Sequence, residues 1–263
     1  MQNKTNKSKT IGIIGGMGPF AGFDLARKIC ENTDASTDHG HIPLILFSFP
    51  SRIPDRSDFL LNSGDSPVPA ITSIFNDIVK AGAEVVGISC NTAHSPSILD
   101  PVLETIDTNK TQFVHIVAEA QNFISKKLPN IRKIGLLSTT ATIKTGIYQH
   151  FFHKAGIEIV VPDDKLQATV LATIYDKECG IKSAPGKNKG LSKQTLAGAI
   201  HELKNKGAEA ILLGCTELPL VLSEQFVHDL PVFDPTEIQA RALIRAAAPE
   251  KLIQSEFYDT NPK

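Results

Sequence analysis

One internal repeat constrains the fold of this chain more than any other feature of its sequence. The segment 82–92, Gly-Ala-Glu-Val-Val-Gly-Ile-Ser-Cys-Asn-Thr, has a near copy at 207–217, Gly-Ala-Glu-Ala-Ile-Leu-Leu-Gly-Cys-Thr-Glu. Both copies begin with Gly-Ala-Glu, continue as a short apolar run and reach a cysteine at the same distance, Cys90 in one and Cys215 in the other. A second pair of segments, 11–14 and 134–137, repeats at nearly the same offset. A period this long does not fit a solenoid, so we predict two copies of one small domain.

The apolar runs that precede the two cysteines predict an α/β fold. Parallel strands that are buried on both faces read as continuous apolar runs, and ligands bind at the carboxyl ends of such strands. We therefore expect two pseudosymmetric lobes, each a mostly parallel sheet flanked by helices, with Cys90 and Cys215 on opposite walls of the cleft between them. The predicted boundaries are a disordered tail over residues 1–9, a first lobe over 10–117 plus about 231–263, and a second lobe over 118–230.

Composition and charge exclude several classes of partner. The formal net charge of −1 offers no electrostatic case for nucleic acid or an anionic membrane. No apolar run approaches the roughly 18 residues of a membrane span, and the Lys-rich start lacks the apolar centre of a signal peptide, so we expect a cytoplasmic protein that binds a small molecule. The four cysteines have no Cys-x-x-Cys spacing and are expected to be free thiols. His39 and His41 are too weak a pair to indicate a metal site.

A glycine-rich segment, 15–18, follows the first predicted strand and precedes a helical pattern that starts at Pro19. Bare amides at a helix start favour an anion, phosphate and carboxylate alike. The same stretch matches the dinucleotide fingerprint Gly-x-Gly-x-x-Ala, but the next predicted strand, 43–47, ends without the acidic residue that binds a ribose. We therefore favour a small anionic ligand over a nucleotide.

The Pro-rich stretch 49–69 is predicted to be a long irregular loop, and long loops in compact domains are often functional. It carries two arginines. For Arg56 two interpretations stay open, a guanidinium that clamps a ligand carboxylate and a solvated surface arginine. For Arg52 we expect the solvated surface position.

Two cysteines at equivalent strand ends indicate proton-transfer chemistry. A thiol between a strand and a helix lies near backbone amides that stabilise its thiolate. One thiolate can remove a proton from one face of a carbon while a thiol on the opposite wall protonates the other face, which inverts the carbon. A substrate with an acidified C–H next to a carboxylate is required, and an amino acid fits. Cys30 and Cys179 lie outside the repeat and are expected to be nonfunctional.

The sequence resembles the aspartate/glutamate racemases that need no pyridoxal phosphate, and specifically their aspartate racemase branch. The match covers the chain from Ile11 onward. Five motifs carry it: Ile-Gly-Ile-Ile-Gly-Gly-Met-Gly-Pro at 11–19, Ile-Pro-Asp-Arg at 53–56, Cys-Asn-Thr-Ala-His at 90–94, Gly-Leu-Leu-Ser-Thr-Thr at 135–140 and Gly-Cys-Thr-Glu at 214–217. Glutamate racemases carry an acidic Asp-Ser pair at the N-terminus in place of the glycines, so the resemblance favours aspartate as substrate.

The resemblance implies a homodimer without a cofactor, in which Cys90 and Cys215 are the paired acid and base. It also implies a set of substrate contacts from both lobes, with the side-chain carboxylate near Arg56 and a loop lysine, for which Lys182 matches best. The expected substrate-binding residues are Met17, Arg56, Asn91, Thr92, Ala93, Thr139, Lys182, Thr216 and Glu217.

Two alternatives remain at this stage. The first keeps the fold and changes the reaction to racemisation of a broader set of amino acids, or to isomerisation or decarboxylation of a dicarboxylate. Decarboxylation needs only one reprotonating cysteine, so the second thiol argues against it. The second alternative is a nonenzymatic sensor that binds an acidic ligand between two lobes.

Overall fold

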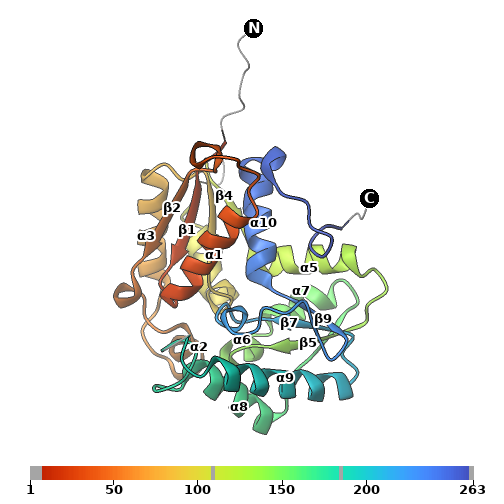
Figure 1. The fold of residues 1–263 in the computed structure, drawn as a ribbon. Helices are drawn as coiled ribbons and strands as arrows, with labels where there is room; N and C mark the ends of the chain where they lie inside the picture. The colour runs from red at the N-terminus through yellow and green to blue at the C-terminus, as the bar shows by residue number, and fades with distance from the viewer. Residues whose placement is uncertain (1–7, 108–109, 184–185, 261–263) are drawn as a thin grey trace.

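The computed structural model describes residues 8–107, 110–183 and 186–260, and it contains two separate sheets (Figure 1). In this part of the chain the first sheet has the strand order β2-β1-β3-β4 and the second has the order β6-β5-β7-β9-β8. All neighbouring strands are parallel except β8 and β9. The strands are β1 (Ile11–Gly15), β2 (Leu44–Ser48), β3 (Val85–Ile88), β4 (Gln112–Val114), β5 (Lys133–Leu137), β6 (Glu158–Val160), β7 (Ala210–Leu213), β8 (Phe226–Val227) and β9 (Leu230–Phe233).

Helices cover both faces of each sheet, as the apolar strands require. In the first lobe α3 and α4 pack on one face, and α1 and α10 pack on the other. In the second lobe α8 and α9 cover one face and α5 and α7 cover the other (Figure 1). The helices are α1 (Pro19–Glu31), α2 (Arg56–Asn62), α3 (Val68–Lys80), α4 (Pro96–Leu103), α5 (Ile116–Lys127), α6 (Thr140–Lys144), α7 (Ile147–His153), α8 (Asp164–Tyr175), α9 (Lys189–Asn205) and α10 (Pro235–Ala247). The predicted fold class is confirmed.

The two sheets repeat one another strand by strand. The order β2-β1-β3-β4 corresponds to β6-β5-β7-β9, so the repeated cysteine segments follow the central strands β3 and β7. The glycine of each opening strand has the same packing role in both halves. A Cβ added at Gly12 would lie 2.7 Å from the Cβ of Ala83, and one at Gly135 would lie 2.7 Å from the Cδ1 of Ile211. The repeat therefore preserves a close approach between a strand and its neighbours.

The C-terminal segment connects the two lobes. We expected residues from about 231 onward to return to the first lobe, but β9 pairs with β7 and extends the second sheet. Helix α10 follows directly and packs against both α1 and α5. Its N-cap, Asp234, forms a buried ion pair with Lys28 of α1. The chain thus crosses from the second sheet to the first between β9 and α10.

Three other local features differ from what the sequence pattern predicts, namely an irregular loop over 49–69, one helix over about 143–155 and a helix that starts over 217–222. The stretch 49–69 is not fully irregular, because Asp55 caps a short helix, α2, through its carboxylate and the N–H of Asp58. The helix expected over 143–155 is divided into α6 and α7 at Gly146, which has a φ of 66°. A single 3-10 turn, Leu218–Leu220, stands where a longer helix is expected after Cys215.

The predicted tail of residues 1–9 lies mostly outside the described residues. Lys9, a tail residue that the structure does describe, donates its backbone N–H to the carbonyl of Ala247 at 3.0 Å. Across the described ranges, none of the helices combines the length and apolarity that a membrane crossing needs.

Candidate active site

A small pocket lies between the carboxyl ends of the central strands of both sheets. Segments that directly follow β1, β3, β5 and β7 line it, together with the start of α2 and the loop after α8. Both repeated cysteines line this pocket, and each is buried. The full lining consists of Met17, Arg56, Ser57, Cys90, Asn91, Thr92, Thr139, Tyr175, Lys182, Cys215, Thr216 and Glu217. Parallel-sheet strand ends are where this fold class binds ligands.

The pocket is closed in this structure. Its volume is about 10 Å³, which is about the space of one water molecule. Several contacts join the lobes here, among them the hydroxyls of Ser57 and Tyr175, which lie 3.4 Å apart, and the Lys182 Nζ, which donates to the Met17 carbonyl at 3.0 Å. A ligand larger than water therefore requires the lobes to separate, as hinged two-lobed proteins do.

The Cys90 side of the pocket carries a buried arginine. Arg56 is only 8% exposed, and its two Nη atoms donate to the carbonyls of Pro54 and Met17 at 3.0 and 2.9 Å. Burial opposes the charge of Arg56, but the neighbouring Cys90 and Asp55 raise its pKa above the ordinary value. Its Nε has no hydrogen-bond partner among the described residues. The solvated surface position is therefore wrong for Arg56, and the interpretation that it clamps a ligand carboxylate stays a prediction.

The Cys215 side of the pocket carries a buried carboxylate instead. The Cys215 thiol donates to Glu217 Oε2 at 3.1 Å, and the Thr216 hydroxyl donates to the same oxygen at 3.2 Å. Burial raises the pKa of Cys215 well above its usual value, and the Glu217 charge raises it further. Cys215 is therefore a neutral thiol at neutral pH.

A lysine and a backbone amide hold Glu217 in its charged form. Lys182 Nζ lies 3.2 Å from Glu217 Oε1, and the N–H of Gly18 donates to that oxygen at 3.0 Å. Burial opposes ionisation of Glu217, but Lys182 and Gly18 together bring its pKa below the usual value. Burial also opposes the charge of Lys182, and Glu217 with Cys215 nevertheless raises the lysine pKa. Glu217 thus couples the second cysteine to the glycine-rich segment of the first lobe.

Hydroxyl and amide groups complete the pocket from both lobes. The hydroxyl of Thr92 lies 2.8 Å from that of Thr142 and 3.4 Å from that of Thr139, so a first-lobe residue contacts the start of α6. The Asn91 side chain accepts a hydrogen bond from the Tyr148 hydroxyl at 2.6 Å. Hydroxyl and amide groups of this kind are donors and acceptors for carboxylates and amino groups.

Ten of the twelve lining residues are those expected from the sequence. Ala93 is buried in the first-lobe core and is not part of the lining. The sequence reasoning missed Ser57 and Tyr175, although Ser57 directly follows Arg56 and Tyr175 directly precedes the long loop of Lys182. It also missed Tyr148, for which no local motif exists. Arg52 is exposed, as expected, and its guanidinium lies 4.9 Å from the ring centre of Phe49.

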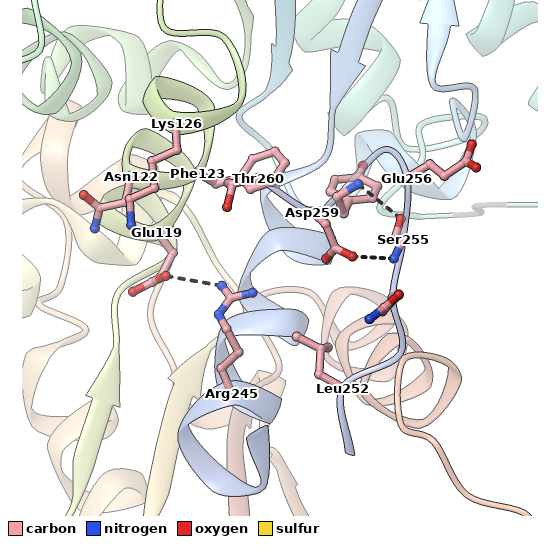
Figure 2. A pocket seen from close by; sticks show the side chains of 12 residues that line it. Glu119, Asn122, Phe123, Lys126, Arg245, Leu252, Ser255, Glu256, Asp259 and Thr260 are labelled. Atoms are coloured by element: carbon pink, nitrogen blue, oxygen red, sulfur yellow. Dashed lines mark hydrogen bonds and ion pairs between the residues drawn. The ribbon is translucent and has the colours of Figure 1, made fainter. Parts of the chain in front are cut away.

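A larger hollow elsewhere does not have these features. It lies between α5, α10 and the C-terminal segment and has a volume of about 1020 Å³ (Figure 2). Glu119 and Arg245 form an ion pair across it at 3.7 Å, and Asp259 accepts from the N–H of Ser255. No cysteine is among the described residues that line it. The thiol-lined pocket is therefore the stronger candidate for chemistry.

Comparison with known proteins gives one family. The model of the family described as Asp/Glu/Hydantoin racemase matches residues 14–243. The structure of an aspartate racemase from Picrophilus torridus is 31% identical, covers 95% of this chain and 97% of its own, and superimposes with a TM-score of 0.79. An aspartate racemase homologue from Pyrococcus horikoshii OT3 is 27% identical over 91% of this chain and 99% of its own, with a TM-score of 0.69.

Glutamate racemases are also similar to this chain. The enzyme from Aquifex pyrophilus is 26% identical over 169 residues, which are 62% of this chain and 58% of that protein. The first curated relatives are matched over only part of their length, 61% for a Pectobacterium protein and 49% for a Mycobacterium leprae glutamate racemase.

Proposed function

Since this chain belongs to the Asp/Glu/Hydantoin racemase family, we propose that it interconverts L- and D-aspartate by proton transfer between Cys90 and Cys215, without a cofactor. One observation carries the proposal. Two buried thiols reach the same closed pocket from equivalent strand ends of two repeated sheets. A sensor that only binds an acidic ligand has no use for a second thiol at the matching position.

The proposed reaction has two proton transfers. The thiolate of one cysteine removes the Cα proton of the bound amino acid, which leaves a carbanion and a thiol. The thiol of the other cysteine then protonates the opposite face of Cα, which leaves a thiolate there. The pair carries one proton before and after the reaction, so either cysteine can begin, depending on which enantiomer is bound.

Cationic and hydrogen-bonding groups supply the binding energy in this proposal. Arg56 and Lys182 bring positive charge from opposite lobes, and guanidinium groups bind carboxylates through paired hydrogen bonds. Charge that develops on the carboxylate next to the carbanion is stabilised most where water is excluded. Closure of the lobes over the substrate therefore places these groups in the low-dielectric surroundings that the reaction needs.

Aspartate is the favoured substrate on two grounds. The Picrophilus torridus aspartate racemase is 31% identical with a TM-score of 0.79, whereas the glutamate racemase structure from Aquifex pyrophilus is 20% identical with a TM-score of 0.58. The glycine-rich segment 15–18 also lies where glutamate racemases carry an acidic Asp-Ser pair. We further propose that the protein is a cytoplasmic homodimer, as its family resemblance implies, and sedimentation of the purified protein tests the dimer.

Incubation with L-aspartate in deuterated water, without added cofactor, tests the function. Proton NMR follows deuteration at Cα while polarimetry follows optical rotation. Rotation should fall to zero as deuterium enters Cα. A panel that includes L-glutamate and L-alanine separates an aspartate enzyme from a racemase with a broad substrate range. If no acidic amino acid shows deuterium exchange at Cα or loss of optical rotation, racemisation is disproved. Ligand-induced thermal stabilisation without turnover would instead favour a sensor.

A further inference from the structure

A buried hydrogen bond joins the second lobe to the pocket side of the first. Tyr148 of α7 is fully buried, and its hydroxyl donates to Asn91 Oδ1 at 2.6 Å. Asn91 directly follows Cys90 and lines the pocket, whereas Tyr148 is not part of the lining. The contact therefore links a pocket residue to a tyrosine that has no contact of its own with the pocket.

Tyr148 can act only as a neutral donor here. Burial raises the pKa of Tyr148 well above its usual value, and Asp234 and Cys215 raise it further. A neutral phenol in an apolar core needs an acceptor for its proton. The Asn91 carbonyl oxygen is such an acceptor, so the hydroxyl selects one of the two orientations of the Asn91 amide.

The selected orientation leaves an unused donor at the pocket. Asn91 is 2% exposed, and its Nδ2 has no hydrogen-bond partner among the described residues. An orphaned buried N–H₂ costs stability unless something accepts from it. The opposite orientation would leave Oδ1 as the atom without a partner, and an oxygen there would repel a bound carboxylate. A carboxylate is the ligand group that satisfies Nδ2 in the orientation observed.

We propose that Tyr148 is a positioning residue that fixes the Asn91 amide with its N–H₂ group toward a substrate carboxylate. The inference rests on the proposed function for the identity of the ligand. The hydrogen bond from Tyr148 to Asn91, in contrast, is present in the protein without a ligand. Because Asn91 and Tyr148 come from different lobes, the donor is correctly oriented only when α7 lies against the Cys90 segment. Substrate binding is thereby coupled to the closed arrangement of the lobes.

A double-mutant cycle on ligand affinity tests the proposal. The parent is the Cys90→Ser/Cys215→Ser protein, which is expected to bind L-aspartate without turnover, and the readout is its dissociation constant by calorimetry. Tyr148→Phe should raise the dissociation constant about tenfold, because the Asn91 amide is then no longer held in the orientation that donates a hydrogen bond to the charged carboxylate. In an Asn91→Ala background the same change should alter affinity less than about twofold, because the effect passes through Asn91.

A matched control separates orientation from the cost of deleting a buried hydroxyl. Tyr258→Phe removes the hydroxyl of a partly buried tyrosine, which accepts from the Asp234 N–H outside the pocket, and should leave the dissociation constant unchanged. In the active protein Tyr148→Phe should raise KM about tenfold with kcat within about threefold, the pattern of lost uniform binding. An unchanged dissociation constant in Tyr148→Phe, or independent effects of Tyr148→Phe and Asn91→Ala in the cycle, would overturn the proposal.

A ligand-free measurement distinguishes failure of this inference from failure of the proposed function. The side-chain N–H₂ signals of Asn91 can be assigned by their loss in Asn91→Asp. In the free protein they should form one sharp pair, and Tyr148→Phe should broaden or double that pair. If the parent does not bind L-aspartate, the proposed substrate is wrong while the NMR result still decides the role of Tyr148. Identical side-chain N–H₂ signals of Asn91 with and without the Tyr148→Phe change would refute the positioning role of Tyr148.

Discussion

The two halves of this molecule have matching strands and unlike surroundings for their cysteines. Cys90 and Cys215 follow equivalent central strands, but Arg56 lies beside the first thiol and Glu217 accepts from the second. The position after Cys90 is an asparagine, and the position after Cys215 is a threonine. The duplication therefore preserved the placement of two sulfurs, while the charges near them diverged.

The difference assigns a resting protonation state to the proposed reaction. Glu217 keeps its neighbour Cys215 as a thiol, whereas Arg56, a cation, lies beside Cys90. The Cys215 thiol is thus ready to act as the acid in the proposed reaction, which leaves the part of base to Cys90. The two enantiomers of aspartate have equal free energy, so kcat/KM must be equal in both directions. The asymmetry can appear only as kcat and KM that change by the same factor.

Replacing the sulfurs tests the similarity of the halves and should have the largest effect. Cys90→Ser and Cys215→Ser should each lower kcat about 10³-fold or more, because a hydroxyl of much higher pKa replaces one of two required proton carriers. Polarimetry at saturating L-aspartate measures the loss. Cys30→Ser and Cys179→Ser are matched controls outside the pocket and should stay within about twofold. A Cys215→Ser enzyme that retains most activity would show that the second half contributes no catalytic thiol.

Removing the cation of the first half should have the next largest effect. Arg56→Gln should lower kcat/KM about 10²-fold, because a buried partner of both Cys90 and the substrate is lost. Arg52→Gln changes an exposed arginine of the same segment and should have no effect beyond about twofold. Initial rates over a range of aspartate concentrations measure both variants. Equal losses in the two variants would mean that burial of Arg56 does not matter for the reaction.

Removing the anion of the second half should change the pH profile more than the maximal rate. The pKa of Cys215 is raised by burial and by Glu217, so Glu217→Gln should lower it while Lys182 remains nearby. The alkaline limb of kcat/KM, where the last thiol loses its proton, should then move to lower pH. Glu224→Gln, at an exposed ion pair with Lys193, is the control. An alkaline limb that stays in place or moves to higher pH contradicts the assignment of Cys215 as the resting acid.

Four residues after Cys90 is the buried His94, whose ring centre lies 4.6 Å from that of the half-buried His115. Four residues after Cys215 is Pro219. Burial lowers the pKa of His115 to about 4 and that of His94 well below its usual value. Between pH 6.5 and 4 the histidines of the unfolded chain bind protons that those of the folded chain do not, so the free energy of unfolding falls as pH falls. The contribution of His115 to this loss approaches about 3 kcal/mol. Urea unfolding at pH 7 and pH 4.5 measures this loss.

The matched variant for this measurement is His115→Asn. The His115 Nδ1 accepts from the N–H groups of Val117 and Ala118 at the start of α5, and an asparagine oxygen can replace that cap. The variant should keep its stability at pH 7 and lose part of the acid sensitivity, with His94 responsible for the remainder. The same acid sensitivity in both proteins would remove His115 from the account.

Local repetition made the main features of the fold and site predictable. The apolar strands, the glycine pair Gly12 and Gly135, and the two strand-end cysteines all follow from the repeat, because each is a requirement of one sheet. The contents of the pocket on the Cys90 side were harder to predict. Burial of Arg56 depends on α2, a seven-residue helix too short for its periodicity to be recognised.

Contacts between the lobes were not predictable from the sequence. The hydrogen bond from Tyr148 to Asn91 joins positions 57 apart in the chain, and no sequence motif of this chain relates the two residues. β9 belongs to the second sheet because it pairs with the free edge of β7. The apolar sequence of β9 predicts a strand but does not indicate which strand it pairs with. These features arise when the two sheets are assembled, and they determine how the pocket closes.

The closed pocket also determines which oxidants can reach the sulfurs. Hydrogen peroxide needs little more space than the one water molecule that the pocket holds, whereas a tripeptide disulfide such as oxidised glutathione is far too large. Oxidation to sulfenic acid therefore needs a much smaller opening than glutathionylation, which has to wait until the lobes part. Substrate that holds the lobes together would protect both sulfurs from the larger oxidant during turnover.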